Sequence, residues 1–289
     1  MTVQLYINYL EGQPRGPLPP QARPAAVPNR QPELREWQAI GHIYREGLFA
    51  GADHTALLSP KFPLKTGLSF ETVIAFVEEN PGSDVYLFDH GAQFRYYNFN
   101  LFQQSENANP GFEARFIECF AQIGEAADFA ALGRSRPDTC ICGNGWIGNA
   151  RFWREVIGDA IRLIDAVKAR PAVWRFLCEP AVLNGQIYPY LPLVLERFVP
   201  YWLMTRSGIS VKAYPYDKDY VLARCVRPLE RPMVSGFYDL FNGWDEAGPW
   251  SPDKRDFIGG LSRAFHRQLR GANDHMIYPW SGERITPVR

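Results

Sequence analysis

Short apolar runs of the strand type alternate along this chain with helical patterns, and this alternation constrains the fold more than any other feature. The clearest run spans residues 84–90 and reads as an acid, four apolar residues, an acid and a histidine. Val, Tyr and Phe favour strands, and a run that is continuous rather than alternating suits a parallel strand covered on both faces. The pattern predicts an α/β fold with a mostly parallel central sheet flanked by helices.

The remaining elements follow from periodicity and end signals. Strands are predicted at residues 4–10, 53–59 and 209–216. Helical spacing predicts helices at residues 32–49, 69–79, 111–123, 152–168, 191–205 and 254–269. Ser69 and Asn149 stand where N-cap residues belong. Residues 11–31 are predicted to be a loop, and the polar, aromatic stretch 91–110 suits either a carbohydrate-binding surface or an ordinary loop.

Composition excludes several classes of protein. With 289 residues and 46% hydrophobic content, the chain can bury a large core without disulfides. Lys plus Arg and Asp plus Glu are both 31, so there is no overall basic field for nucleic acid. No apolar run has the length of a membrane span and no signal peptide is recognisable. The five scattered cysteines suit free thiols in a reducing cytosol, which predicts a cytoplasmic protein; peripheral membrane contact stays open.

Familiar catalytic signatures are missing. There is no G-x-G-x-x-G after the first predicted strand, no P-loop, no G-x-S-x-G elbow and no H-E-x-x-H spacing. Polar residues at the ends of predicted strands remain. In an open α/β sheet, ligands bind just beyond the carboxyl ends of the strands. Asp89 and His90 would lie there, and Asp89 would either hold a metal or a sugar hydroxyl, or cap the next turn.

Three segments carry a resemblance to a known family. They are the acid–strand–acid run at 84–89, the loop and helix start at 142–153, and the Glu-Arg helix at 192–203 with the strand that follows it. In these segments the chain resembles bacterial glycosyltransferases with the nucleotide-diphospho-sugar transferase (GT-A) fold, of the surface-polysaccharide type. The resemblance covers residues 1–216 as a single Rossmann-like nucleotide-sugar domain and leaves 217–289 as a C-terminal extension packed on the core.

The resemblance implies a function, partners and a cofactor. It implies transfer of a sugar from a nucleotide-sugar donor to a hydroxyl of a glycan acceptor. In the family, the equivalent strand ends in a D-x-D motif that holds Mn²⁺ or Mg²⁺. Here Asp89 is the one acid at that position and the candidate metal ligand, so metal dependence stays open. A literal D-x-D at residues 217–219 comes too late in the chain and is predicted to be a polar turn.

The resemblance and the chemistry together nominate site residues. Lys61 and Lys65 would neutralise the leaving diphosphate without metal, although a solvated loop explains them equally. Glu196 is the first choice for the base that takes the acceptor proton, with Glu179 and Asp53 as rivals. The predicted catalytic residues are Glu196 and Asp89. The predicted donor-binding residues are Tyr6, Tyr9, Lys61, Lys65, Asp89, His90, Asn144, Trp146 and Arg197.

Two other functions stay open at this point. The incomplete acidic motif favours a carbohydrate-binding or scaffolding protein that keeps the fold without turnover. A nucleotidyltransferase that does not transfer sugar would use the same layout. The aromatic and acidic residues of the C-terminal region would build an acceptor site, a subunit contact or a small core.

Overall fold

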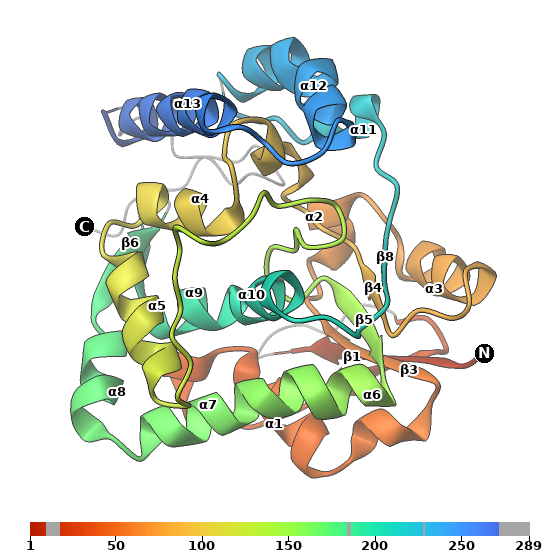
Figure 1. Cartoon of the computed structure of the whole chain (residues 1–289). Helices are drawn as coiled ribbons and strands as arrows, with labels where there is room; N and C mark the ends of the chain where they lie inside the picture. Colours follow the sequence, from red (N-terminus) through yellow and green to blue (C-terminus); the bar gives the residue numbers. More distant parts are fainter. Residues whose placement is uncertain (10–17, 184–185, 228, 272–289) are drawn as a thin grey trace.

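A six-stranded mixed sheet forms the centre of the computed structural model, which describes residues 1–9, 18–183, 186–227 and 229–271. The strand order is β2-β1-β3-β5-β4-β8. Only β5 runs antiparallel to its neighbours, so the other five strands of the described sheet are parallel (Figure 1). These strands are β1 (Val3–Asn8), β2 (Ala22–Ala25), β3 (His54–Leu58), β4 (Val85–Leu87), β5 (Trp146–Asn149) and β8 (Val211–Ala213). The predicted α/β class is therefore confirmed.

Helices surround this sheet, and a separate hairpin pairs β6 (Pro180–Leu183) with β7 (Gln186–Pro189). The short 3-10 or π-helical elements are η1 (Pro32–Leu34), η2 (Leu48–Gly51), η3 (Ala92–Tyr96) and η4 (Trp153–Ile157). The α-helices before β5 are α1 (Trp37–Arg45), α2 (Phe62–Thr66), α3 (Phe70–Glu79), α4 (Leu101–Ala108) and α5 (Phe112–Ala121). Those after it are α6 (Ala150–Phe152), α7 (Gly158–Lys168), α8 (Pro171–Leu177), α9 (Tyr190–Glu196), α10 (Phe198–Thr205), α11 (Lys218–Ala223), α12 (Glu230–Glu246) and α13 (Pro252–Gly271).

The continuous apolar strand is covered on both faces, as its composition predicts. Val85 and Leu87 of β4 enter the large core cluster that includes α1, α5, α7 and α9. Tyr86 and Phe88 enter a second cluster with α3 on the other face. Strand β3, which β5 separates from β4 in the sheet, is also buried along its whole length. Because successive strand residues point to opposite faces, a strand between two helical layers needs apolar residues at every position.

Local end signals are also confirmed. The Ser69 hydroxyl accepts a hydrogen bond from the backbone N–H of Thr72 at the start of α3. Asn149 accepts one from the backbone N–H of Phe152 at the start of α6. The helix predicted at 191–205, however, is two helices that break at Arg197. Pro200 lacks a backbone N–H, and its ring would crowd the carbonyl four residues earlier, so one continuous helix is disfavoured there.

Two loop predictions are wrong. Within residues 11–31, of which 10–17 are outside the described residues, β2 adds a parallel edge strand to β1. Within residues 91–110, Asn100 caps α4 by accepting hydrogen bonds from two backbone N–H groups. The aromatic residues Tyr96 and Tyr97 are buried, so they form a core and not a carbohydrate surface.

That core joins the C-terminal helices to the rest of the protein. Tyr97 and Phe99 share a hydrophobic cluster with Phe241 of α12 and Phe265 of α13. The Tyr97 hydroxyl donates a 2.7 Å hydrogen bond to the fully buried Glu230 of α12. Helices α11 and α12 therefore pack on η3, and α13 packs on α4 (Figure 1). The rest of the predicted extension, 272–289, is outside the described residues.

The start of β4 is tied to both of its neighbours by Asp84. The carboxylate accepts hydrogen bonds from Asn149 (2.8 Å) at the end of β5 and from the backbone N–H of Ser210 (2.8 Å) before β8, and it lies 3.4 Å from Arg151. Burial raises the pKa of Asp84, but the hydrogen bonds from Ser210 and Asn149 and the Arg151 charge outweigh it. The net effect lowers the pKa below its ordinary value of 3.8.

We expect Asp84→Asn to destabilise the protein by about 1–3 kcal/mol at pH 7, because charge-assisted hydrogen bonds are lost. A lowered carboxyl pKa stabilises the fold above pH 3.8, and this contribution is lost as pH falls through the folded-state pKa. The mutational effect on urea unfolding should therefore shrink as the pH falls below 3.8. Asp165→Asn, which breaks an exposed ion pair with Arg45, is the control and should cost less than about 1 kcal/mol. A pH-independent cost for Asp84→Asn would contradict the role of its charge.

Candidate functional site

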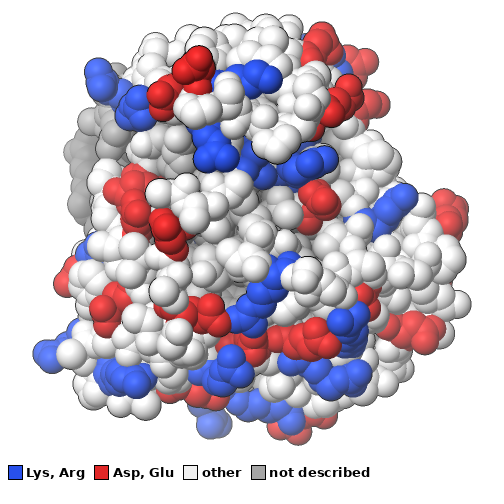
Figure 2. Space-filling view, in the orientation of Figure 1, with Lys and Arg blue, Asp and Glu red and all other residues white. Residues whose placement is uncertain are grey.

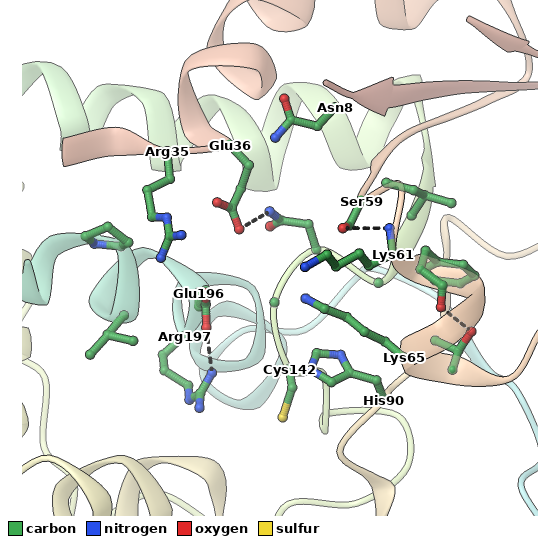
Figure 3. Close-up of a pocket in the computed structure, with 18 of the residues that line it drawn as sticks. Asn8, Arg35, Glu36, Ser59, Lys61, Lys65, His90, Cys142, Glu196 and Arg197 are labelled. Atoms are coloured by element: carbon green, nitrogen blue, oxygen red, sulfur yellow. Dashed lines mark hydrogen bonds and ion pairs between the residues drawn. The ribbon is translucent and has the colours of Figure 1, made fainter. Parts of the chain in front are cut away.

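A pocket of about 480 Å³ lies at the carboxyl ends of the central parallel strands. Asn8 ends β1, Ser59 follows β3 and His90 lies just beyond β4, and all three line the pocket (Figure 3). The loop before β5 adds residues 142–145. Open α/β sheets bind ligands at this edge because the connecting loops diverge there. The volume is in the range that small-molecule sites occupy.

Two other segments complete the walls. Arg35 and Glu36 lie between η1 and α1, and Glu196 and Arg197 lie at the break between α9 and α10. Figure 3 shows the two pairs on the same side of the pocket, with the Glu196–Arg197 ion pair drawn as a dashed line. The helix break thus has a consequence for the site, since it places two consecutive charged residues at the pocket wall.

Among the charged side chains that line the pocket, basic ones outnumber acidic ones. Two carboxylates, Glu36 and Glu196, face five basic residues. These are Arg35, Lys61, Lys65, Arg197 and Arg227. On the face of the molecule shown in Figure 2, charges of both signs are intermixed. Arg227 is paired with the fully buried Glu230, so the excess of positive charge in the pocket comes from Arg35, Lys61, Lys65 and Arg197 against Glu36 and Glu196. The formally neutral chain lacks such an excess as a whole, and the pocket suits an anionic ligand.

Lys61 and Lys65 come from one turn of helix. Lys61 is the N-cap of α2 and Lys65 lies in its last turn, so their four-residue spacing puts them on one side. Figure 3 shows both amino groups directed into the pocket. Lys61 is exposed and Lys65 is half-buried. Two adjacent ammonium groups are suited to a ligand with more than one negative charge.

Arg197 is a buried cation held from α4. Its Nε donates to the Ser105 hydroxyl at 2.9 Å and its Nη2 to the Gln104 side-chain oxygen at 3.0 Å. Its Nη1 lies 3.7 Å from the Glu196 carboxylate. These contacts fix the guanidinium in one orientation at the pocket wall.

Glu196 and His90 have pKa values shifted by this environment. Burial raises the pKa of Glu196 and the negative charge of Glu36 raises it further, while the charges of Arg197, Lys65 and Arg35 oppose them; the net shift is upward. Burial lowers the pKa of His90, and Lys65 and Arg197 lower it further, to about 3. The His90 imidazole is therefore neutral at physiological pH. Its neutral form adds no charge to the pocket.

Six of the predicted site residues meet in this pocket: Lys61, Lys65, His90, Asn144, Glu196 and Arg197. They come from four separate segments of the chain. The Asn144 amide donates a 3.3 Å hydrogen bond to the Glu36 carboxylate. The structure thus brings these six residues together in one pocket, and their roles in donor binding and catalysis stay predictions.

The other candidates lie elsewhere. Tyr9 and Trp146 are buried, and Trp146 packs its ring against Phe152 and Trp153. Tyr6 is half-buried and packs against the main core cluster. None of the three lines the pocket, because strand residues turn their side chains into the helical layers. The rival bases are also outside the pocket: Asp53 is exposed and bonded to Thr2, and Glu179 pairs with Arg115.

Asp89 is buried beneath the pocket and does not line it. One carboxylate oxygen accepts hydrogen bonds from the backbone N–H groups of Gly91 (3.0 Å) and Cys142 (2.9 Å), and the other accepts from the Cys140 thiol at 3.2 Å. These contacts match the turn-capping alternative for Asp89. In the described part of the chain, no cluster of three or more His, Cys, Asp or Glu is arranged to hold a metal ion. Asp89, the predicted metal ligand, therefore directs its carboxylate oxygens to the backbone and to the Cys140 thiol and not into the pocket.

Sequence reasoning missed several lining residues. Arg35, Glu36 and Tyr188 fall in segments where the sequence shows no motif. Arg35 and Glu36 were within a predicted continuous helix, whereas the structure has a break between η1 and α1 at this point. Neither helical periodicity nor the resemblance contains a signal for such a break.

No family model, curated protein or solved structure matches this chain. Within the described residues, every helix is too short or too polar to cross a membrane. The residues that line the pocket are therefore the basis on which a function is proposed.

We expect Asp89→Ala to cost about 1–3 kcal/mol of stability in urea unfolding, because two buried N–H groups lose their acceptor. Asp53→Ala is the matched control: its carboxylate also accepts two hydrogen bonds, but at the exposed surface, so its loss should cost much less. Unchanged stability of the Asp89 variant, together with loss of ligand binding, would instead make Asp89 a direct ligand-binding residue.

Proposed function

We propose that this protein is a glycosyltransferase that moves a sugar from a nucleotide-sugar donor to an acceptor hydroxyl. The observation that carries the proposal is the pocket at the strand ends, in which the basic side chains outnumber the two carboxylates. A departing nucleoside diphosphate concentrates negative charge, and fixed cations stabilise the transition state in which this charge develops. A pocket for a neutral glycan alone has no need of this charge.

Glu196 is the proposed general base. A carboxyl group with a raised pKa is a stronger base than an ordinary glutamate, and general bases work best when their pKa approaches the working pH. As Glu196 takes the acceptor proton, the acceptor oxygen forms a bond to the anomeric carbon of the donor sugar. The bond from that carbon to the diphosphate oxygen breaks, and its electron pair leaves with the diphosphate. Lys61 and Lys65 face the charge that this step creates.

The basic side chains supply positive charge of the kind that a divalent metal supplies in the resembling family. We therefore expect transfer to proceed without added Mn²⁺ or Mg²⁺, and no step is assigned to a metal.

The position of Asp89 favours a second candidate function, a carbohydrate-binding protein, because the Asp89 oxygens accept hydrogen bonds from the protein's own backbone and from a thiol. A carbohydrate-binding protein without turnover would have the same feature.

A panel of nucleotide sugars tests the proposal directly. The purified protein should hydrolyse or transfer one donor, with similar rates in Mn²⁺ and in EDTA. Lys61→Ala with Lys65→Ala should lower kcat/KM by at least about tenfold, since each lost charge contact is worth on the order of 1–3 kcal/mol. Binding of glycans with no affinity for any nucleotide would instead support the carbohydrate-binding alternative.

The pH dependence tests the role of Glu196. Activity should rise with pH through the pKa of Glu196, which lies above the ordinary value of 4.5, because the base must be ionised. Glu196→Gln should lower kcat by about 10²–10⁴. Glu36→Gln removes the negative neighbour that raises this pKa, so it should move the acid limb of the profile to lower pH. Glu33→Gln, the same change outside the pocket, should leave the limb in place. An unmoved limb in Glu36→Gln would contradict the coupling.

A further inference from the structure

The backbone of Arg35 is unusual. Its φ is 50° and its ψ is −129°, and it is the one non-glycine residue with positive φ in the part of the chain that the structure describes. A residue with a side chain is strained in this region, and such strain persists only where the surroundings hold it. Backbone hydrogen bonds hold Arg35 on both sides: its N–H donates to the Pro32 carbonyl, and its carbonyl accepts from Gln38.

The Arg35 side chain is also held. Its guanidinium carbon lies 4.4 Å from the centre of the Tyr188 ring, which belongs to β7. A guanidinium over an aromatic face is held there by cation–π attraction, and its planar N–H fork can still donate to an anion. Both residues line the pocket, and Figure 3 shows the Arg35 side chain pointing into it.

Lys61 and Lys65 reach the same space from α2. Figure 3 shows Arg35 and the two lysines approaching the cavity from different walls, one wall formed by the segment before α1 and the other by α2. An anion between these walls would contact a planar fork of N–H donors on one side and two ammonium groups on the other. A diphosphate has charged oxygens on two adjacent phosphorus centres, which suits this arrangement better than a single carboxylate.

We propose that Arg35 is a preformed anion-binding arginine that holds a diphosphate group against Lys61 and Lys65, with Tyr188 as its brace. The inference rests on the proposed function for the identity of the ligand, a nucleotide-sugar donor. The strained backbone and the contact with the Tyr188 ring place the guanidinium before the ligand arrives, so less conformational entropy is lost on binding. Arg35 here is a binding residue, and it takes no part in proton transfer.

The experiment is calorimetric titration of inorganic pyrophosphate into the whole protein in buffer with EDTA. The wild type should bind, and both Arg35→Ala and Arg35→Gly should weaken binding at least tenfold. Arg45→Ala, an exposed arginine of α1 outside the pocket, should bind as the wild type does. Tyr188→Phe keeps the ring and should keep binding, whereas Tyr188→Ala should weaken it.

A second readout separates binding from strain. Glycine adopts positive φ without penalty, so Arg35→Gly should unfold at a higher temperature than Arg35→Ala although both lose the guanidinium. Wild-type-like pyrophosphate binding in Arg35→Ala would overturn the proposal, and equal unfolding temperatures for the two variants would overturn its strained, preformed state. Pyrophosphate carries no sugar, so its binding tests the anion site separately from the transferase. If pyrophosphate binding depends on Arg35 but no nucleotide sugar is turned over, the anion site stands and the transferase is rejected.

Discussion

The buried carboxylate of Asp89 is the interaction on which the pocket depends. It joins the chain leaving β4, at Gly91, to the loop that leads into β5, at Cys142. These two segments are separated by about fifty residues of sequence, yet His90 from one and residues 142–145 from the other form the same wall. Burial raises the pKa of Asp89, while the backbone N–H groups of Gly91 and Cys142 and the Cys140 thiol lower it; the net shift is upward. A carboxylate is kept there because it can accept from all three donors.

Charge then gives the pocket its chemistry. The basic residues stabilise the ionised form of Glu196, but burial and Glu36 outweigh them. The same basic residues, together with burial, keep His90 neutral. The site therefore combines fixed positive charge with one carboxyl group that holds its proton more tightly than usual. Anion binding and proton acceptance can occur side by side in such a site without cancelling each other.

Much of the fold could be predicted because its signals are local. The apolar run at 85–88 indicated a buried parallel strand, and Ser69 and Asn149 marked helix starts through hydrogen bonds spanning three residues. The antiparallel insertion of β5 could not be predicted this way, since strand direction depends on which loop brings the chain back to the sheet. Helix α4 was also missed: Asn100 caps it, but the polar residues of this stretch lack the apolar periodicity from which a helix is predicted.

The sequence by itself determined four strands of the described sheet (β1, β3, β4 and β8) and the polar residues that follow them, whereas β2 and β5 were not predicted as strands. Only the tertiary structure decided which of those polar residues face the pocket. Asp89 and His90 are adjacent in sequence, yet Asp89 is buried with its backbone partners while His90 lines the cavity. Arg35 and Lys61 show the converse, because they are far apart in sequence and reach one cavity. Side-chain direction beyond a strand is set by contacts with distant segments, and local sequence patterns do not encode those contacts.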